Sequence, residues 1–398
     1  MDWQDFKLED IIDIKHGFAF KGEFFSDKPT NNILLTPGNF KIGGGFKKDK
    51  FKYYNGPIQE KYILKNNDLI VTMTDLSKKG DTLGFSAKVP NDKQKKFLHN
   101  QRIGLVELLD NRFSLEFIYW LLRTSEYQKF VVGSATVGTV KHTSPSKIRS
   151  YKFKAPKDSF FRNKICKILS SYENLIECNY QKINLLEKYG KILYENCFVN
   201  FKLNDKKMDI DSKTKLPFGW EQVKVGSLLK KIKSTLKIKS SEILKDGKYP
   251  VIDQGAEFIA GYTNETNIQY YTDSPFIVFG DHTRKIKFIN FSFARGADGT
   301  QILISNNERM PQTLFYYSLI NIGLTNFHYA RHFKFLKEKY IILPTKDISQ
   351  EYGKQFNYIF EKIRNLRNQI KFLEESRDIL LPRLFNGTIK LKNINIAA

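Results

Sequence analysis

The sequence is poor in cysteine and has no long uninterrupted run of apolar residues. Among its 398 residues, Cys166, Cys178 and Cys197 are the only cysteines, and they show no Cys-x-x-Cys spacing. This pattern favours an intracellular protein without disulfides. No apolar run approaches the roughly 20 residues that cross a bilayer, so we expect no membrane anchor. Residues 1–5 do not begin a secretory signal, and we expect a cytoplasmic location.

The sequence also lacks the motifs of enzymes that act on DNA. No Gly-x-x-x-x-Gly-Lys-Ser/Thr phosphate loop occurs, so we expect no ATP hydrolysis. Amino-methylating DNA methyltransferases carry an Asn/Asp-Pro-Pro-Tyr/Phe motif. The most similar segment here, Asp273-Ser-Pro-Phe276, has Ser instead of Pro at the second position, and we expect it to form a turn. Nuclease sites of the Pro-Asp…Asp/Glu-x-Lys kind are not indicated, because no Pro-Asp dipeptide occurs and no Glu is followed two residues later by Lys. We therefore expect no catalytic residues.

Positive charge is what the sequence has in excess. Lys and Arg number 65 against 42 Asp and Glu, which gives a formal net charge of +23. This excess indicates a polyanionic partner, with nucleic acid as the leading candidate, although a basic protein without such a partner stays an alternative. A hydrophobic content of 41% with 14% aromatic residues indicates folded domains. The length suits two or three of them.

Three segments of the first half recur in the same order in the second half. The pairs are Trp3–Ile12 with Trp220–Leu229, Tyr151–Pro156 with Lys339–Pro344, and Gln181–Glu187 with Asn368–Glu374. The offset falls from 217 at the first pair to 188 at the second, so the second copy is 29 residues shorter between them. The copies diverge strongly between these landmarks. A duplicated chain with common edges and different middles indicates one scaffold with two different specificities.

Each copy begins with a part in which strands and helices are mixed. Short apolar runs bounded by Gly and Asn, such as Leu69–Val71 and Phe276–Phe279, predict strands. Helices are predicted over Ser114–Leu122 and Pro311–Ile320, each with a start signal as its first residue. We therefore expect an α+β fold with two mixed α/β domains.

The segments after the two closing prolines carry a seven-residue repeat. An apolar seam held over five heptads in both copies predicts two helices that pack along their length. The seam residues are Ile165, Leu169, Tyr172, Ile176, Asn179, Ile183, Leu186 and Leu193, and in the second copy Phe356, Ile359, Ile363, Leu366, Ile370, Leu373 and Leu380. Two matching helices most simply pair as an antiparallel coiled coil, which would place the two domains in a pseudo-twofold arrangement at opposite ends of a rod.

Four residues of these helices carry more specific expectations. Asn179 is a polar residue in the seam that either fixes the register or faces solvent. Gly190 either lets the two backbones approach closely or loosens its helix. Pro382 is expected to limit the second helix, and Gly387 suits the position just past its end.

The length of the first helix suggests how such a chain would meet DNA. A helix from about residue 160 to 197 is roughly 57 Å long, or about 17 base pairs at about 3.4 Å per base pair. Two linked domains at that distance would recognise two short tracts separated by bases that they do not touch. The helix length would then set the gap.

These features together resemble the specificity subunits of Type I restriction–modification enzymes. Trp3–Ile12 and Leu216–Glu221 resemble the start of the family's two domains. Leu193–Phe201 resembles the end of its central helix, and Leu380–Lys390 resembles the end of its distal helix. The similarity covers essentially the whole chain in the right order. It implies two target-recognition domains, each of which recognises half of a split site in double-stranded DNA, and two spacer helices that dock two methyltransferase subunits.

The resemblance further implies a non-catalytic subunit. Methylation of adenine N6 and ATP-driven cleavage would belong to the methyltransferase and restriction/translocase subunits. S-adenosylmethionine, ATP and Mg²⁺ would be cofactors of those partners, and this chain would hold none. The expected parts are a first recognition domain 1–157, central helix 158–200, linker 201–219, second recognition domain 220–346, distal helix 347–385 and C-terminal tail 386–398.

Candidate DNA contacts are basic residues in loops, because Lys and Arg bind phosphates and also contact base edges. They are Lys47, Lys48, Lys50, Lys52, Lys78, Lys79, Lys93, Lys95 and Lys96 in the first domain, and His282, Thr283, Arg284, Lys285, Arg331 and His332 in the second. The loops that follow the apolar runs at 69–71 and 276–279 occupy matching places and are the best candidates for base recognition. For any single residue, a solvated surface charge is an equal alternative. His328 and His332 have a spacing that binds metals on helices, but their neighbours favour a basic aromatic segment without a metal.

Two other functions stay open at this point. A regulator that binds duplex DNA alone would need no methyltransferase partner, so co-purification distinguishes it from a subunit. A coiled-coil scaffold without a nucleic-acid role is disfavoured by the net charge of +23.

Overall fold

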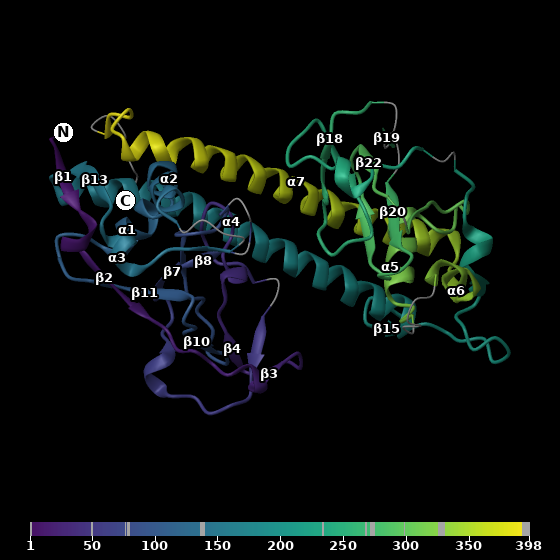
Figure 1. Ribbon diagram of the computed structural model, residues 1–398. Helices are drawn as coiled ribbons and strands as arrows, with labels where there is room; N and C mark the ends of the chain where they lie inside the picture. Colours follow the sequence, from purple (N-terminus) through teal and green to yellow (C-terminus); the bar gives the residue numbers. More distant parts are fainter. Residues whose placement is uncertain are drawn as a thin grey trace. The chain divides into compact units, whose positions relative to one another are not determined.

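The computed structural model describes residues 2–48, 51–75, 77, 80–135, 140–232, 235–266, 269–270, 275–297, 299–324 and 331–391. The chain divides into two compact units. Unit 1 comprises Met1–Ile176 and Lys371–Ala398, and unit 2 comprises Glu177–Ile370. Each unit therefore combines one globular part with one half of each of two long helices (Figure 1).

Among its described residues, the globular part of unit 1 contains a two-stranded ribbon, two larger sheets and three α-helices. The ribbon pairs β1 (Trp3–Lys7) with β13 (Lys152–Pro156). One sheet has the order β2 (Ile12–His16), β11 (Ile103–Leu108), β7 (Leu69–Thr72), β9 (Ser86–Lys88). The other has the order β3 (Phe25–Ser26), β5 (Lys52–Tyr54), β4 (Asn32–Leu34), β10 (Lys96–Leu98), β6 (Ile63–Leu64). A short pair joins β8 (Thr74–Asp75) to β12 (Lys141–His142), and the helices are α1 (Leu115–Leu121), α2 (Ser125–Gly133) and α3 (Pro145–Arg149).

The globular part of unit 2 is built on the same plan. Its ribbon pairs β16 (Glu221–Lys224) with β24 (Tyr340–Leu343). One sheet has the order β21 (Ile286–Ile289), β20 (Phe276–Gly280), β23 (Thr300–Leu303), and the other β18 (Gly261–Thr263), β17 (Tyr249–Ile252), β22 (Phe293–Arg295), β19 (Gln269–Tyr270). The helices are α5 (Gln312–Ile320) and α6 (His332–Glu338), and a hairpin of β14 (Lys202–Leu203) and β15 (Lys206–Lys207) lies in the linker.

The repeated sequence segments form the base of each globular part. The opening segment supplies one ribbon strand and the closing segment supplies its partner, so that Trp3 lies opposite Pro156 and Glu221 lies opposite Leu343. The strands predicted at 69–71 and 276–279 and the helices predicted at 114–122 and 311–320 are confirmed as β7, β20, α1 and α5. The Ser114 hydroxyl caps α1 by accepting a hydrogen bond from the Phe117 amide at 3.1 Å.

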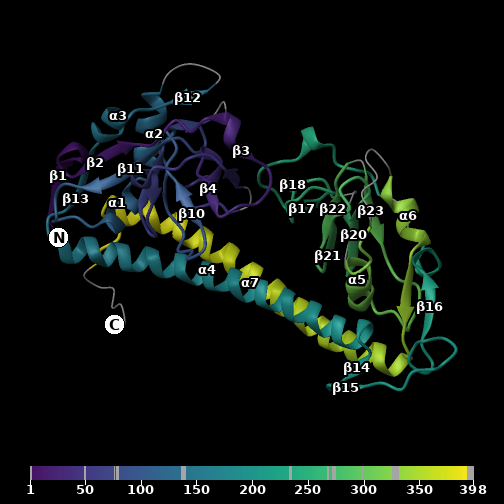
Figure 2. The same ribbon diagram turned by 90° about the horizontal axis from the view of Figure 1, so that it is seen from below.

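Two long helices complete the structure and run antiparallel (Figures 1 and 2). They are α4 (Ser159–Tyr194), which continues into a π-helical turn (Glu195–Val199), and α7 (Lys346–Phe385). In unit 1, the start of α4 packs against the end of α7, and Ile165 shares a core with Leu384. In unit 2, the end of α4 packs against the start of α7, where the Phe198 and Tyr352 rings lie 5.3 Å apart. The expected fold of two mixed α/β domains with antiparallel helices is confirmed.

The seam face of both helices is turned inward. Buried seam residues are Ile165, Leu169, Ile176, Asn179, Ile183, Phe356, Ile359, Ile363 and Ile370, and half-buried ones are Tyr172, Leu186, Leu193, Leu366, Leu373 and Leu380. The Asn179 side chain is only 5% exposed, and its Nδ2 donates a hydrogen bond to Gln369 Oε1 at 3.3 Å. Of the two alternatives for Asn179, the solvent-facing one is therefore wrong. A buried amide that pairs across the seam penalises shifted registers, because a shift leaves it without a partner.

Two further residues, Pro382 and Gly387, mark the end of the second helix. α7 ends at Phe385, the expected bound, three residues after Pro382, and Asn386 N donates to Pro382 O at 2.9 Å. A proline in the last turn removes only the hydrogen bond that its own missing N–H would make to the carbonyl four residues earlier. It leaves the rest of the helix intact, because the last four carbonyls of a helix have no partner in the helix in any case. Gly387 follows the helix with a φ of 77°, as a residue past a helix end often does.

Gly190 makes room for a side chain of unit 2 rather than for the other helix. A Cβ atom added at Gly190 would lie 1.9 Å from Tyr317 Oη, on α5. Gly190→Ala is expected to lower the free energy of unfolding by about 1–3 kcal/mol through overpacking, despite the higher helix propensity of alanine. Urea denaturation measures the effect. Gly133→Ala on α2 is the control, because an added Cβ there meets nothing within 4 Å. A Gly190→Ala variant as stable as the control would contradict the prediction.

Candidate nucleic-acid interface

Two of the predicted lysines share one face of the five-stranded sheet in unit 1. Lys52 of β5 lies opposite Leu34 of β4. Lys96 of β10 lies opposite Asn32, two residues earlier on the same strand. Opposed residues project to the same face, as do residues two apart, so the Lys52 and Lys96 side chains lie on one face of the sheet. Both are exposed, and Lys52 Nζ lies 5.6 Å from the Phe25 ring centroid.

The other predicted lysines of the first domain differ in how much the structure describes. Lys93 and Lys95 are exposed just before β10, and Lys95 Nζ lies 3.3 Å from the Asp92 carboxylate. Lys48 is exposed and Lys47 is half-buried. Lys50, Lys78 and Lys79 lie outside the described residues.

A buried carboxylate anchors the loop that follows β7, the loop predicted to recognise bases. Asp75 is 4% exposed and accepts hydrogen bonds from Ser77 N at 2.6 Å and from Thr82 N and Oγ1 at 2.5 and 2.8 Å. Burial by itself raises the pKa of Asp75, but these hydrogen bonds outweigh it and hold the pKa below its ordinary value. The carboxylate is therefore ionised at neutral pH and ties both ends of the loop to the sheet.

Sequence reasoning missed two residues that lie beside this loop. Lys141 and His142 form β12, which pairs with β8, so that Lys141 lies opposite Asp75. His142 is exposed, and its Nδ1 lies 3.1 Å from Thr74 Oγ1. The two segments are far apart in the sequence, so only the strand pairing brings these basic residues to the predicted loop.

The loop after β20 in unit 2 is also held in place. Gln254 accepts a hydrogen bond from His282 N through its side chain at 3.1 Å and from Thr283 Oγ1 through its main-chain carbonyl at 2.6 Å. Arg284 adopts a left-handed backbone with a φ of 59°, which is uncommon for a residue other than glycine. His282, Thr283 and Lys285 are exposed. A loop fixed in an unusual conformation with basic residues facing outward suits a recognition element.

The prediction of a DNA contact at His332 is wrong. His332 is 2% exposed, and both its amide and its Nδ1 lie 2.9 Å from the main-chain carbonyl of Asp281. Asp281 Oδ1 also accepts a hydrogen bond from Phe333 N at 2.7 Å, so this aspartate anchors the start of α6. Arg331, next in the chain, is exposed. His328 lies outside the described residues, among which no group of three or more His, Cys, Asp or Glu is arranged to hold a metal.

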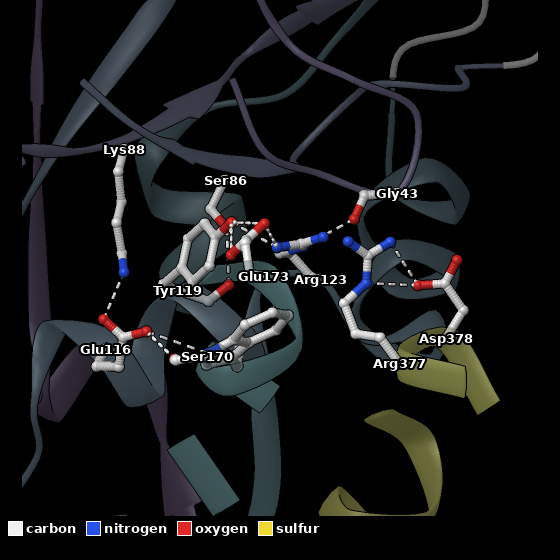
Figure 3. Close-up of polar contacts among 11 residues, drawn as sticks. Gly43, Ser86, Lys88, Glu116, Tyr119, Arg123, Ser170, Glu173, Arg377 and Asp378 are labelled. Carbon is white, nitrogen blue, oxygen red and sulfur yellow. Dashed lines mark hydrogen bonds and ion pairs between the residues drawn. The ribbon is translucent and has the colours of Figure 1, made fainter. Parts of the chain in front are cut away.

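A buried polar network in unit 1 was also missed by sequence reasoning (Figure 3). Arg123 follows α1 and is 4% exposed. Its Nη1 lies 2.9 Å from Glu173 Oε1 on α4, and its Nε donates to Gly43 O at 2.9 Å. Tyr119 Oη donates to the Glu173 carboxylate at 2.7 Å. Burial alone raises the pKa of Glu173, but the Arg123 charge and these hydrogen bonds lower it overall.

The same network continues along α1. The Glu116 carboxylate lies 2.5 Å from Lys88 Nζ of β9, and its other oxygen accepts hydrogen bonds from Trp120 Nε1 at 3.2 Å and from Ser170 Oγ at 2.5 Å. Ser86 Oγ donates to Tyr119 O at 2.8 Å. The contacts fasten a loop, a strand and a short helix of the globular part to α4 (Figure 3), so they fix the sheets of unit 1 relative to the start of the long helix.

In unit 2, aromatic rings occupy the corresponding place. Glu173 corresponds to Phe360 in the repeat of the two helices. The Phe360 ring stacks on Phe288 of β21 with centroids 3.8 Å apart and lies 5.3 Å from Tyr316 of α5. The two units thus use the same elements to join sheet and helix, with polar contacts in one and aromatic packing in the other.

Two α/β parts joined to two long helices are the architecture that the sequence predicted for a DNA-recognition subunit. Comparisons with known proteins point to the same class. Residues 1–188 match the family described as Type I restriction modification DNA specificity domain. The MjaIX specificity subunit of a Type I restriction enzyme from Methanocaldococcus jannaschii is 26% identical over 311 residues, covering 70% of each chain. A relative from the same organism, named as the MjaX specificity subunit, is 24% identical over 98% of this chain and 94% of its own length.

A solved structure shares the fold. The crystal structure of the S subunit of a Type I restriction–modification system from M. genitalium superposes with a TM-score of 0.56, covering 96% of both chains at 18% identity. The match over residues 1–188 places the first part of the chain in the DNA specificity domain family of Type I restriction–modification enzymes, and 96% of the chain shares the fold of a solved S subunit. Among the described residues, no helix is both long and apolar enough to span a membrane.

Proposed function

We propose that this chain recognises a split target in double-stranded DNA, with one tract contacted by each unit. The observation that carries the proposal is a contrast between two kinds of element. The ribbons and long helices, here called the repeated frame, recur in both units, whereas the sheets and loops between them, here called the recognition parts, carry unlike residues. The ribbons β1–β13 and β16–β24 and the long helices match between the units, and the sheets share one strand order, to which unit 1 adds the edge strands β2 and β3. The residues of these sheets and their loops diverge strongly between the two copies. The exposed basic residues lie on those differing parts, at Lys52 and Lys96 in unit 1 and at the 282–285 loop in unit 2.

The long helices also carry a candidate surface for two copies of one partner. Leu185 and Ile192 on α4 are 65% and 55% exposed, although they belong to a helix whose seam is buried. Phe372 and Ile379 occupy the corresponding places on α7, at an offset of 187, and are 64% and 53% exposed. Leu185 and Ile192 lie in unit 2, and Phe372 and Ile379 lie in unit 1. We call these two pairs the apolar stripes. Exposed apolar residues that recur in register suit one docking site for a methyltransferase subunit in each unit.

In this proposal the chain itself is not catalytic. Methylation of adenine and DNA cleavage belong to the methyltransferase and restriction/translocase subunits, which bring S-adenosylmethionine, ATP and Mg²⁺. The absence of methyltransferase and ATPase motifs from the sequence supports this division.

Methylome sequencing tests the proposed function. Cells that express this chain with the methyltransferase subunit of its own system are expected to carry modified adenines in a motif of two fixed tracts separated by unspecified bases. Cells that express the methyltransferase subunit alone are the control and are expected to lack the motif. A contiguous motif, or a motif that does not depend on this chain, would overturn the proposal.

Lys52→Ala and Lys96→Ala test whether the shared sheet face binds phosphates. Each substitution is expected to weaken binding to all duplex sequences alike and to reduce the slope of log affinity against log salt by about 0.9. Fluorescence anisotropy at several salt concentrations measures both quantities. Lys129→Ala, at an exposed position on α2, is the matched control and should leave the slope unchanged. An unchanged slope in both sheet variants would show that this face does not contact DNA.

A further inference from the structure

Two hollows correspond to each other under the internal duplication. The hollow in unit 1 has a volume of about 480 Å³ and is lined by Asp5, Lys154 and Phe385. The hollow in unit 2 has a volume of about 250 Å³ and is lined by their counterparts Gln222, Ile342 and Phe198. Each lies between the ribbon of its unit and the end of a long helix. The hollows therefore lie at the repeated frame, and the short helices α1 and α2 in unit 1 and α5 in unit 2 contribute to their lining.

The ribbon beside the hollow of unit 1 has an open edge. Main-chain hydrogen bonds from Leu8 N to Tyr151 O and from Lys157 N to Asp2 O, both 2.9 Å, bracket the pairing of β1 with β13. Since the pairs of an antiparallel ladder alternate, the main-chain groups of Lys152 and Lys154 point away from β1. Within the described residues, β13 pairs with no second strand.

The ribbon of unit 2 has the same open edge in the same register. Val225 N donates to Lys339 O at 2.9 Å, in the place of the Leu8–Tyr151 bond. The main-chain groups of Tyr340 and Ile342 therefore point away from β16. Across the described chain, β24 pairs with β16 alone. The two edges therefore present the same pattern of main-chain N–H and C=O groups. The residues that present them differ, because they are two lysines in unit 1 and Tyr and Ile in unit 2.

Each apolar stripe leads into the hollow of its own unit. In the π-helical turn that continues α4, Val199 follows Ile192 by seven residues, is 45% exposed and lines the hollow of unit 2. Just past the end of α7, Asn386 follows Ile379 by seven residues and lines the hollow of unit 1. A partner seated on a stripe would therefore reach the hollow without leaving the surface of its unit.

We propose that each hollow accepts an extended segment of the methyltransferase subunit, which adds a strand to β13 in unit 1 and to β24 in unit 2. The inference rests on the proposed docking of two methyltransferase copies. Main-chain pairing suits two edges that differ in side chains but match in backbone, because such pairing depends little on side chains. An apolar side chain of the segment enters beside Phe385 in one unit and beside Phe198 in the other. One segment thereby serves both sites.

Hydrogen exchange of single amides, with the purified methyltransferase subunit of the same system as the probe, tests the strand addition. The outward amides of Lys152, Lys154, Tyr340 and Ile342 are expected to exchange at least tenfold more slowly in the complex than in the free chain. The amides of Phe153 and Ile341 are internal controls, because they already face the ribbon partner. Unchanged exchange at the four outward amides in a complex with two methyltransferase copies would overturn the inference.

Proline variants of the full chain test the same edges independently. The amides of Lys154 and Ile342 donate no bond within their ribbons, so Lys154→Pro and Ile342→Pro block the edge while sparing the ladder. Each variant is expected to weaken one methyltransferase site at least tenfold, which native mass spectrometry detects as a shift from two bound copies to one. Lys154→Ala and Ile342→Ala are the controls and should bind two copies. Folded proline variants that bind two copies with unchanged affinity would overturn the inference.

Stripe variants separate failure of this inference from failure of the proposed function. Leu185→Glu and Phe372→Glu are expected to disrupt methyltransferase binding even if the hollows stay empty. If they disrupt it while the proline variants bind normally, the inference about the hollows is overturned and the docking stands. If the unmodified chain binds no methyltransferase, both are overturned.

Discussion

Deleting one heptad from each long helix is expected to shorten the gap in the methylated motif by about three base pairs and to leave its two tracts unchanged. The deletions are Cys178–Asn184 from α4 and Asn365–Lys371 from α7, and they leave the residues of both apolar stripes in place. Seven residues shorten a helix by about 10.5 Å, which is about three steps of 3.4 Å along DNA. Whole heptads keep every remaining seam residue on the inward face. The windows face each other around the Asn179–Gln369 hydrogen bond, so both helices lose the same stretch.

Methylome sequencing of cells that express the shortened chain with its methyltransferase measures the gap directly. Deletion from α4 alone is the control. It leaves one helix seven residues shorter than the other, so the seam contacts of unit 1 and those of unit 2 cannot both form. We therefore expect methylation to disappear. A shortened chain that methylates the original motif with its original gap would show that the helices do not set the spacing.

The parts of the fold that the sequence predicted are those with a local or repeated signal. The seam follows from a seven-residue period that needs no knowledge of the partner helix, and the ribbons follow from segments that occur twice. The end of the second helix at Phe385 was predicted from Pro382 and Gly387, because both residues act on the backbone locally. Gly190 was ambiguous because the group that it accommodates, Tyr317, lies 127 residues away.

The candidate interface was less predictable for a physical reason. A basic residue in a loop looks the same in sequence whether it faces solvent or a buried carbonyl, and His332 proved to be bound to Asp281, 51 residues earlier. Lys141 and His142 reach the predicted loop only through strand pairing. Such contacts depend on which distant segments meet, and the recognition parts carry no repeat from which this could be inferred.

The polar network of unit 1 shows the same limit at the junction of sheet and helix. In sequence, Glu173 looks like any charged residue beside a seam, yet it pairs with Arg123 from 50 residues earlier. Its counterpart Phe360 looks like an extra seam residue and packs on Phe288. The contact between globular part and long helix, here called the joint, therefore lies at the same place in both units, but it is polar in unit 1 and aromatic in unit 2. Removing one partner of the polar joint should therefore affect unit 1 alone.

Arg123→Ala is expected to lower the free energy of unfolding of unit 1 by about 3–5 kcal/mol. The substitution leaves the Glu173 carboxylate without its positive partner, with only the Tyr119 hydroxyl still donating to it, and leaves the Gly43 carbonyl without its donor. An uncompensated charge in this largely buried place is costly. Urea denaturation followed by tryptophan fluorescence measures the loss, because Trp120 belongs to the network. Lys15→Ala, which breaks the exposed pair with Glu107, is the control and should cost no more than about 1 kcal/mol.

The pH dependence of this effect has a definite sign. Because the pKa of Glu173 is lowered in the folded chain, its contribution is complete above the ordinary glutamate value of 4.5 and is lost as pH falls through the lower folded value. The stability difference between the parent chain and Arg123→Ala should therefore be largest near neutral pH and shrink below about pH 4.5. Replacing both partners, with Arg123→Met and Glu173→Leu, should recover part of the loss, because no buried charge then lacks its partner. A loss for Arg123→Ala no larger than that for Lys15→Ala would mean that packing alone holds the joint of unit 1, as it does in unit 2.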